Sequence, residues 1–163
     1  MRQARTDEIA SRVIAGKNRW NSEVEFIDGT GGYGAGVVDS MIRAGAQPYE
    51  INFASRPDDA RYKNKRAEMW FRFSDWVKRG GVLPRCVDLK KELTSQTYGF
   101  SKDGKMILED KEIIRKRLGY SPDRGDALAL TFAIDEMQAQ LPNQRQVTGG
   151  IVSDYDPLSR SRI

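Results

Sequence analysis

The sequence contains no histidine, a single cysteine and no long apolar segment. Without histidine the chain cannot form a Ser-His-Asp triad, a Cys-His pair or the usual His/Cys zinc sites. Cys86 has no intrachain disulfide partner, which favours a reducing cytoplasm. No apolar run approaches the roughly 20 residues that span a bilayer, so we expect a soluble protein without a membrane partner. Any metal chemistry must rely on carboxylates, which favour Mg²⁺ or Mn²⁺.

The chain is mildly basic, with 27 Lys and Arg against 23 Asp and Glu among 163 residues. A net charge of +4 is compatible with nucleic-acid binding and equally with an ordinary solvated surface. The length suits one domain with one core. We expect that domain over residues 1–141. Residues 142–163 are rich in Gly, Ser and Arg, which predicts a mobile polar tail.

The periodicity of apolar residues predicts an α/β domain. Gly16 is interpreted as a helix stop, and Ser121-Pro122-Asp123 as a helix start. Two strands make a thin sheet for so much helix, which suggests that further strands precede the chain. The expected elements are strands over 23–28 and 48–53, a hairpin over 96–109 turning at Asp103-Gly104, and helices over 5–15, 33–44, 62–79, 87–95, 110–118 and 121–140.

A glycine-rich turn over residues 29–36 follows the first expected strand. Gly29, Gly31 and Gly34 have the G-x-G-x-x-G spacing of dinucleotide-binding turns. Asp28 argues against that interpretation, because its carboxylate would lie beside the pyrophosphate. Two interpretations of Asp28 stay open: an Asx-turn, and a carboxylate presented at the sheet edge to a metal or polyanion.

Asp123 and Asp126 form a second acidic pair, three residues apart on one helix face. The helix dipole explains an acid in the first turn, which accounts for Asp123. Asp126 is in line with Leu130 and Ala133 on a face predicted to be buried, and a buried carboxylate needs a compensating cation. A metal ion would supply it. If Asp28 converges on this pair, the three acids form a carboxylate site suited to two-metal phosphodiester hydrolysis.

Basic and aromatic residues concentrate around the long expected helix. The aromatics Trp70, Phe73 and Trp76, with Met69 and Val77, are predicted to face the core, and Val37, Val38, Met41 and Ile42 form the apolar face of the helix over 33–44. Glu68 and Glu109 are interpreted as partners of basic residues. The basic clusters are either phosphate contacts or solvated faces; they comprise Arg56, Arg61, Lys63, Lys65 and Arg66, then Lys111, Arg115, Lys116 and Arg117.

Four ordered stretches resemble the nuclease domain of phage terminase large subunits. They are DGTGGYGAGVVD from Asp28, YKNKRAEMW over 62–70, ILEDKEIIRKRLG over 107–119 and SPDRGDALALTFA over 121–133. The resemblance implies a ribonuclease H-like nuclease fold that here lacks its first strands. It matches Asp28 to a catalytic strand acid, Asp126 to the helix acid and Asp123 to an auxiliary metal-site position.

The same resemblance implies a metal-dependent endonuclease that cuts concatemeric double-stranded phage DNA in the host cytoplasm. The implied cofactor is Mg²⁺ or Mn²⁺, with two ions in an intact domain. The implied partners are phage DNA, the terminase ATPase domain, the small subunit and the portal. The sequence departs from the family at the front: the first-strand acid has no matching position, and no G-x-x-x-x-G-K-[ST] phosphate-binding loop occurs.

Because the first-strand acid is missing, an inactive prophage or split-gene fragment that binds DNA or a packaging partner is the alternative function. Another ribonuclease H-like enzyme, such as a resolvase or transposase, is a third. The runs NKRAEMW and SPDRGDALAL argue against that last possibility.

Overall fold

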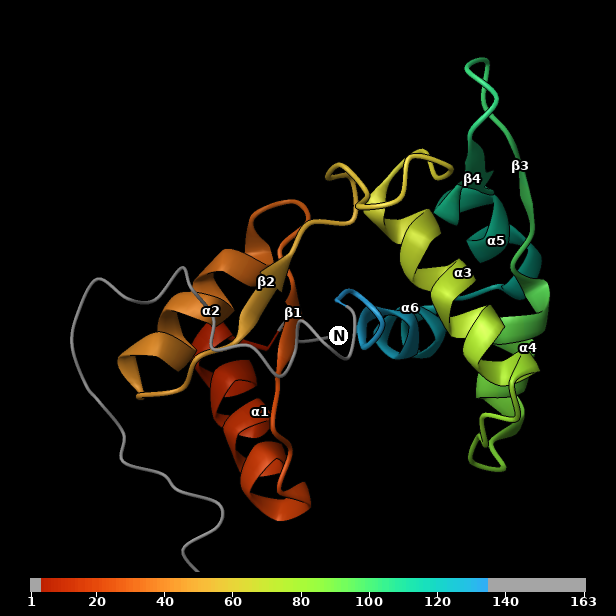
Figure 1. Ribbon diagram of the computed structural model, residues 1–163. Coiled ribbons are helices and arrows are strands. Elements are labelled where there is room, and N and C mark those ends of the chain that lie inside the picture. Colours follow the sequence, from red (N-terminus) through yellow and green to blue (C-terminus); the bar gives the residue numbers. More distant parts are fainter. Residues whose placement is uncertain (1–3, 135–163) are drawn as a thin grey trace, which may run out of the picture.

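The computed structural model describes residues 4–134 (Figure 1). No helix of this part is long and apolar enough to cross a bilayer. The elements in chain order are α1 (Thr6–Trp20), β1 (Phe26–Asp28), α2 (Tyr33–Arg43), β2 (Tyr49–Ile51), α3 (Lys65–Lys78), α4 (Val87–Ser95), β3 (Tyr98–Phe100), β4 (Met106–Leu108), α5 (Lys111–Leu118) and α6 (Asp123–Leu130).

The strands β1 and β2 are parallel and are joined by α2, with Phe26 opposite Tyr49 and Asp28 opposite Ile51. Successive side chains of a strand point to opposite faces of the sheet. Ile27 accordingly packs into a cluster with α1 and α2, whereas Phe26 packs into the larger core around α3 and α6. The result is three layers, with the sheet between α1–α2 and α6–α3 (Figure 1).

The larger core is built mainly by α3 and α6. Met69, Trp70 and Phe73 are buried there, together with Ala129 and Leu130. The rings of Trp70 and Phe73 meet edge to face at 6.1 Å between centroids, a favoured aromatic geometry. The prediction that these aromatics form core rather than a base-stacking surface is confirmed. Trp76 packs beside them, partly buried.

Two residues predicted to face inward are exposed. Ile42 on α2 is 53% exposed, and Val77 on α3 is 37% exposed. Both follow a residue that does pack inward, Met41 and Trp76 respectively. A step of one residue rotates the side chain by about 100° around the helix axis, which is enough to carry it out of the apolar stripe.

The structure also corrects three helix bounds. The first helix continues through Gly16 to Trp20 and ends where Asn21 adopts a left-handed conformation at φ 50°. The long helix begins at Lys65, after Asn64 caps it by accepting from the backbone N–H of Ala67 at 3.0 Å. The last helix ends at Leu130, and residues 131–134 form turns and bends. Residues 135–140 of the expected helix and the expected tail lie outside the described residues.

Candidate functional site

Asp28 is the last residue of β1, as predicted, and its side chain is exposed. It lies on the same face of the strand as Phe26, so it is directed to the side of the sheet that α6 covers. Its Oδ1 accepts a hydrogen bond from the backbone N–H of Thr30 at 2.9 Å, which is an Asx-turn. The Asx-turn therefore exists, and it orients the carboxylate at the strand end.

The glycines after Asp28 make a tight strand-to-helix turn. Gly31 has φ 79°, a conformation that side chains disfavour. A Cβ on Gly34 would lie 1.9 Å from the backbone oxygen of Asp28, so no other residue fits there. The path of the backbone thus accounts for Gly31 and Gly34, and the dinucleotide interpretation gains no support.

Asp126 is buried near the start of α6, with 4% of its surface exposed. Its Oδ1 accepts a hydrogen bond from the indole Nε1 of Trp70 at 3.0 Å. The same oxygen accepts from Arg66, from Nε at 3.2 Å and Nη2 at 3.1 Å. The predicted burial is confirmed, and α3 supplies a cation and a neutral donor to one carboxylate oxygen.

Lys111, the first residue of α5, lies between the two acids of α6. Its Nζ is 2.9 Å from Oδ2 of Asp126 and 3.3 Å from Oδ1 of Asp123. The contact between Lys111 and Asp126 is an ion pair and not a hydrogen bond. The buried Oδ2 of Asp126 accepts no hydrogen bond within the described residues. Burial alone would lower the pKa of Lys111, but the neighbouring carboxylates outweigh burial and raise it.

Asp123 differs from Asp126 in being exposed. The hydroxyl of Ser121 donates to its Oδ1 and lowers its pKa, and the charge of Lys111 acts in the same direction. The expected compensating charge for the buried Asp126 is supplied within the described residues by Lys111 and Arg66. The metal-ligand roles expected of Asp126 and Asp123 stay predictions.

The start of α6 is anchored by a group that sequence reasoning missed. Glu92 of α4 is 2% exposed, and its Oε2 accepts the backbone N–H of Gly125 at 2.8 Å. A Cβ on Gly125 would lie 3.0 Å from the ring of Trp70, so the helix approaches that ring closely. The only sequence signal was a glycine inside a helix, which often marks close packing.

Two of the predicted DNA contacts are internal. Lys65 is 7% exposed and pairs with Asp58 and Glu68 at 2.7 and 2.8 Å, so it is corrected to a structural counter-ion. Arg66, with a side chain 13% exposed, is engaged by Asp126. Helical periodicity alone could not predict that Lys65 and Arg66 face inward, because their partners Asp58 and Asp126 lie outside α3.

The other predicted DNA contacts remain at the surface. Arg61 pairs with Asp59, Lys63 with Asp103, and Arg115 with Glu112. Lys111 is the member of this set that touches the α6 acids, and its side chain is 41% exposed. The predicted role of Glu109 as a partner of basic residues is confirmed by its ion pair with Arg117 at 2.7 Å.

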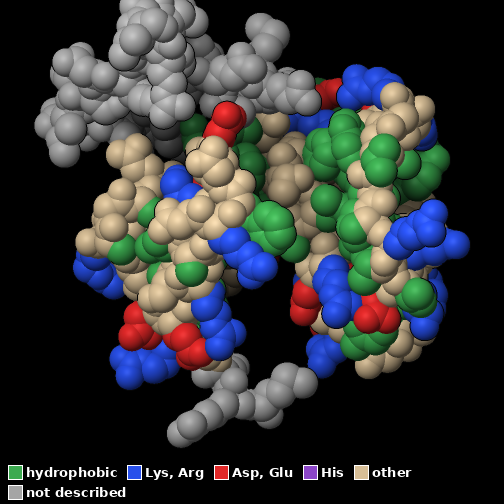
Figure 2. All heavy atoms as spheres, turned by 90° about the horizontal axis from the view of Figure 1, so that it is seen from below, with side chains coloured by type: hydrophobic (Ala, Val, Ile, Leu, Met, Phe, Trp, Pro, Cys, Tyr) green, Lys and Arg blue, Asp and Glu red, His purple; other side chains and the backbone are tan. Residues whose placement is uncertain are grey.

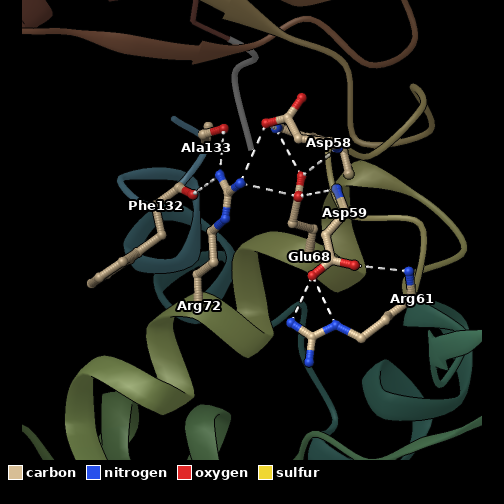
Figure 3. Close-up of polar contacts among 8 residues, drawn as sticks. Asp58, Asp59, Arg61, Glu68, Arg72, Phe132 and Ala133 are labelled. Atoms are coloured by element: carbon tan, nitrogen blue, oxygen red, sulfur yellow. Dashed lines mark hydrogen bonds and ion pairs between the residues drawn. The ribbon is translucent and has the colours of Figure 1, made fainter. Parts of the chain in front are cut away.

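A polar network centred on Glu68 joins the loop before α3 to the end of α6 (Figure 3). Glu68 is fully buried and accepts from the backbone N–H groups of Asp58 and Asp59. Arg72 donates to Glu68 and also to the backbone oxygen of Ala133 at 3.3 Å. The structural role predicted for Glu68 is thereby confirmed, and the network fixes the end of the helix that carries Asp126.

The acids of the described residues do not make a metal site by themselves. No three acidic or cysteine side chains within 4–134 lie close enough together to hold an ion. The buried Asp126 has its charge balanced by two basic side chains, and Asp28 is held by its own turn. The described residues therefore do not complete a divalent-metal site on their own, and we derive no catalytic step through an ion.

Comparison with solved structures relates the three-layer arrangement to one fold. A mutant nuclease domain of the large terminase subunit gp2 of bacterial virus Sf6, with manganese, superposes with a TM-score of 0.63 at 20% identity, over 79% of this chain and 73% of that one. The fold is that of a phage terminase nuclease domain. The same mutant domain with calcium gives 0.63, and the domain without a named metal gives 0.62, each at 20% identity over 79% of this chain and 72% of that one.

No protein-family model and no curated protein sequence matches the chain. The likeness therefore rests on the path of the backbone, and at 20% identity it shows the terminase nuclease fold alone. The ribonuclease H-like α/β class expected from the four sequence stretches is confirmed.

Proposed function

We propose that this chain acts as the nuclease domain of a phage DNA-packaging terminase, an endonuclease for double-stranded DNA that depends on a divalent metal ion. The fold likeness supports the domain type. The manganese and calcium in two of the similar Sf6 structures support the dependence on a divalent metal ion. Residues 1–141 would form this domain. The proposal rests on the position of two carboxylates. Asp28 ends β1 on the face of the sheet that α6 covers, and Asp126 is buried near the start of α6.

In this proposal Asp28, Asp126 and Asp123 are the ligands that the chain contributes to Mg²⁺ or Mn²⁺. Since the described residues hold no complete set, a further ligand has to come from outside them. Arg61, Lys63, Lys111 and Arg115 would bind phosphates without reading bases. Partners by likeness are the ATPase domain, the small subunit and the portal, within a bacterial host cell.

A second function is binding of DNA without cleavage, as an inactive prophage or split-gene fragment would do. One observation favours it: Lys111 and Arg66 neutralise Asp126, so the acid that the first proposal requires is already engaged. The exposed basic side chains would still attract phosphates.

The two functions are separated by nicking of supercoiled plasmid in Mn²⁺, with DNA binding measured in parallel. Asp28→Asn and Asp126→Asn test the acids. Asp88→Asn is the matched control, since Asp88 is an exposed acid on α4 that pairs with Arg124 of α6. Circular dichroism establishes that each variant is folded.

Cutting that Asp28→Asn and Asp126→Asn abolish and Asp88→Asn preserves supports the endonuclease. Salt-dependent binding without cutting by the folded chain supports the second function. Arg115→Ala should then weaken binding similarly for all sequences and lower the salt slope by about one. Absence of both cutting and binding rejects both proposals.

A further inference from the structure

A groove of about 920 Å³ lies in the described residues, and none of the acids of β1 and α6 lines it. Its walls are α3 and α4, and it is closed at one side by β3 and the segment 83–86. The two helices each pack on α6 but have little contact with each other, which leaves the space between them open. The groove is therefore a product of the fold and not of one side-chain position.

The groove surface is mostly apolar and partly open to solvent. Phe73 and Leu89 are buried in its floor, whereas Val87 is 70% exposed and Tyr98 is 59% exposed on its rim. Contiguous apolar surface of this kind on a soluble protein marks a binding site more often than chance exposure. Figure 2 shows hydrophobic side chains gathered beside basic ones on the half of the molecule that holds α3 and α4.

The charge of the lining has one sign. Lys78, Arg85 and Lys90 line the groove, and no acidic residue does. Lys78 pairs with Asp75 outside the groove, while Arg85 and Lys90 form no ion pair within residues 4–134. An occupant with an apolar face would pack on the groove floor, and acidic residues beside that face would pair with the basic side chains of the groove.

The spacing of the wall residues indicates the shape of that occupant. On α3 they span Trp70 to Lys78 and on α4 Val87 to Thr94, so each wall is about 12 Å long at 1.5 Å per residue. That length accommodates two turns of helix, whose anchors recur at i, i+3, i+4 and i+7. We propose that the α3–α4 groove is a docking site for an acidic amphipathic helix of a partner protein.

Cys86 gives a direct test, because it lines the groove and is the only cysteine of the chain. The probe is a synthetic peptide of about 12 residues, with leucine at i, i+3, i+4 and i+7 and glutamate elsewhere. The alkylation rate of Cys86 in the full chain is followed by mass spectrometry. Saturating peptide is expected to slow alkylation by about tenfold, since a covered thiol does not react.

Variants separate the charge and apolar contributions. Arg85→Glu combined with Lys90→Glu should reverse the preference, so that a lysine version of the peptide protects and the glutamate version does not. Val87→Asp should abolish protection while keeping the fold, because an acid is favourable in the first turn of α4. Lys116→Glu, an exposed lysine on α5 that does not line the groove, should change nothing.

Equal protection by both peptides, or none by either, overturns the proposal. So does a Cys86 that resists alkylation in the full chain before any peptide is added, because this chain's own residues would then fill the groove. None of these outcomes depends on nuclease activity.

Discussion

The indole nitrogen of Trp70 donates to the buried Asp126 across 3.0 Å, joining the middle of α3 to the start of α6. This contact replaces a water hydrogen bond that a carboxylate loses on burial. The same ring also lines the groove beside α4. One side chain thus links the candidate acid to the candidate docking surface.

Trp70→Phe should lower the free energy of unfolding by about 1–3 kcal/mol, because it removes the neutral donor and keeps most of the aromatic volume. Trp76→Phe is the matched control, since the side chain of Trp76 donates no hydrogen bond within the described residues. Urea denaturation measures both. Equal losses would mean that ring packing, not the bond to Asp126, sets the stability.

Gly125→Ala should destabilise the protein by about 1 kcal/mol despite the higher helix propensity of alanine, because overpacking outweighs propensity. The new Cβ would be 3.0 Å from the Trp70 ring, so a ring that is held by its hydrogen bond to Asp126 would have to shift. Gly16→Ala, inside α1 with open space around it, should instead stabilise by about 0.5–1 kcal/mol. Thermal melts of the pair test whether the two signs are opposite.

Glu68→Gln should cost about 3–5 kcal/mol, because it leaves the buried Lys65 and the partly buried Arg72 short of a counter-charge. Glu8→Gln removes an exposed ion pair with Arg12 and should cost less than about 0.5 kcal/mol. Denaturant midpoints give both values. A small loss for Glu68→Gln would show that its backbone hydrogen bonds, which glutamine keeps in part, carry the network.

Asp58 should contribute stability that is lost in acid. Burial would raise its pKa, but its contacts with Lys65 and Arg72 outweigh burial and hold the pKa below 3.8. The folded state then binds the proton less readily than the unfolded state. The contribution is therefore complete above pH 3.8 and disappears as the pH falls through the lower folded value.

The melting-temperature gap between the wild type and Asp58→Asn should accordingly shrink as the pH falls below 3.8. Because Asp58 is half exposed, the gap at neutral pH should correspond to less than about 1 kcal/mol. Asp39→Asn serves as control, an exposed acid on α2 with no ion pair within the described residues. A gap that stays constant into acid would rule out the ion pairs as its origin.

Local patterns predicted the elements whose determinants are local. The helix over 87–95 has the predicted bounds, and the hairpin turns at Gly104 with φ 72°, as its Asp-Gly signal indicated. The strand end at Asp28 was likewise readable, because the apolar run and the glycines that follow it lie side by side in the sequence.

Long-range contacts decided the features that the sequence could not predict. The apolar pattern continues past Leu130, but the helix ends there, where Arg72 from α3 binds the backbone oxygen of Ala133. The burial of Asp126 followed from periodicity, yet its partners Arg66 and Lys111 lie on other elements. Tertiary packing sets pairings of this kind. From the sequence alone, a metal ion and a lysine were therefore equally good candidates for the cation that balances Asp126.

The turn after Asp28 has a consequence for pattern searches. Gly34 lies almost in contact with the backbone of Asp28, and Gly31 has a backbone angle suited to glycine. A chain that passes from strand to helix by this path favours glycine at the positions of Gly31 and Gly34, whatever it binds. In such a fold the glycines report the geometry of the strand-to-helix turn. A sequence search built on their spacing will therefore find proteins that share this turn and not necessarily a ligand.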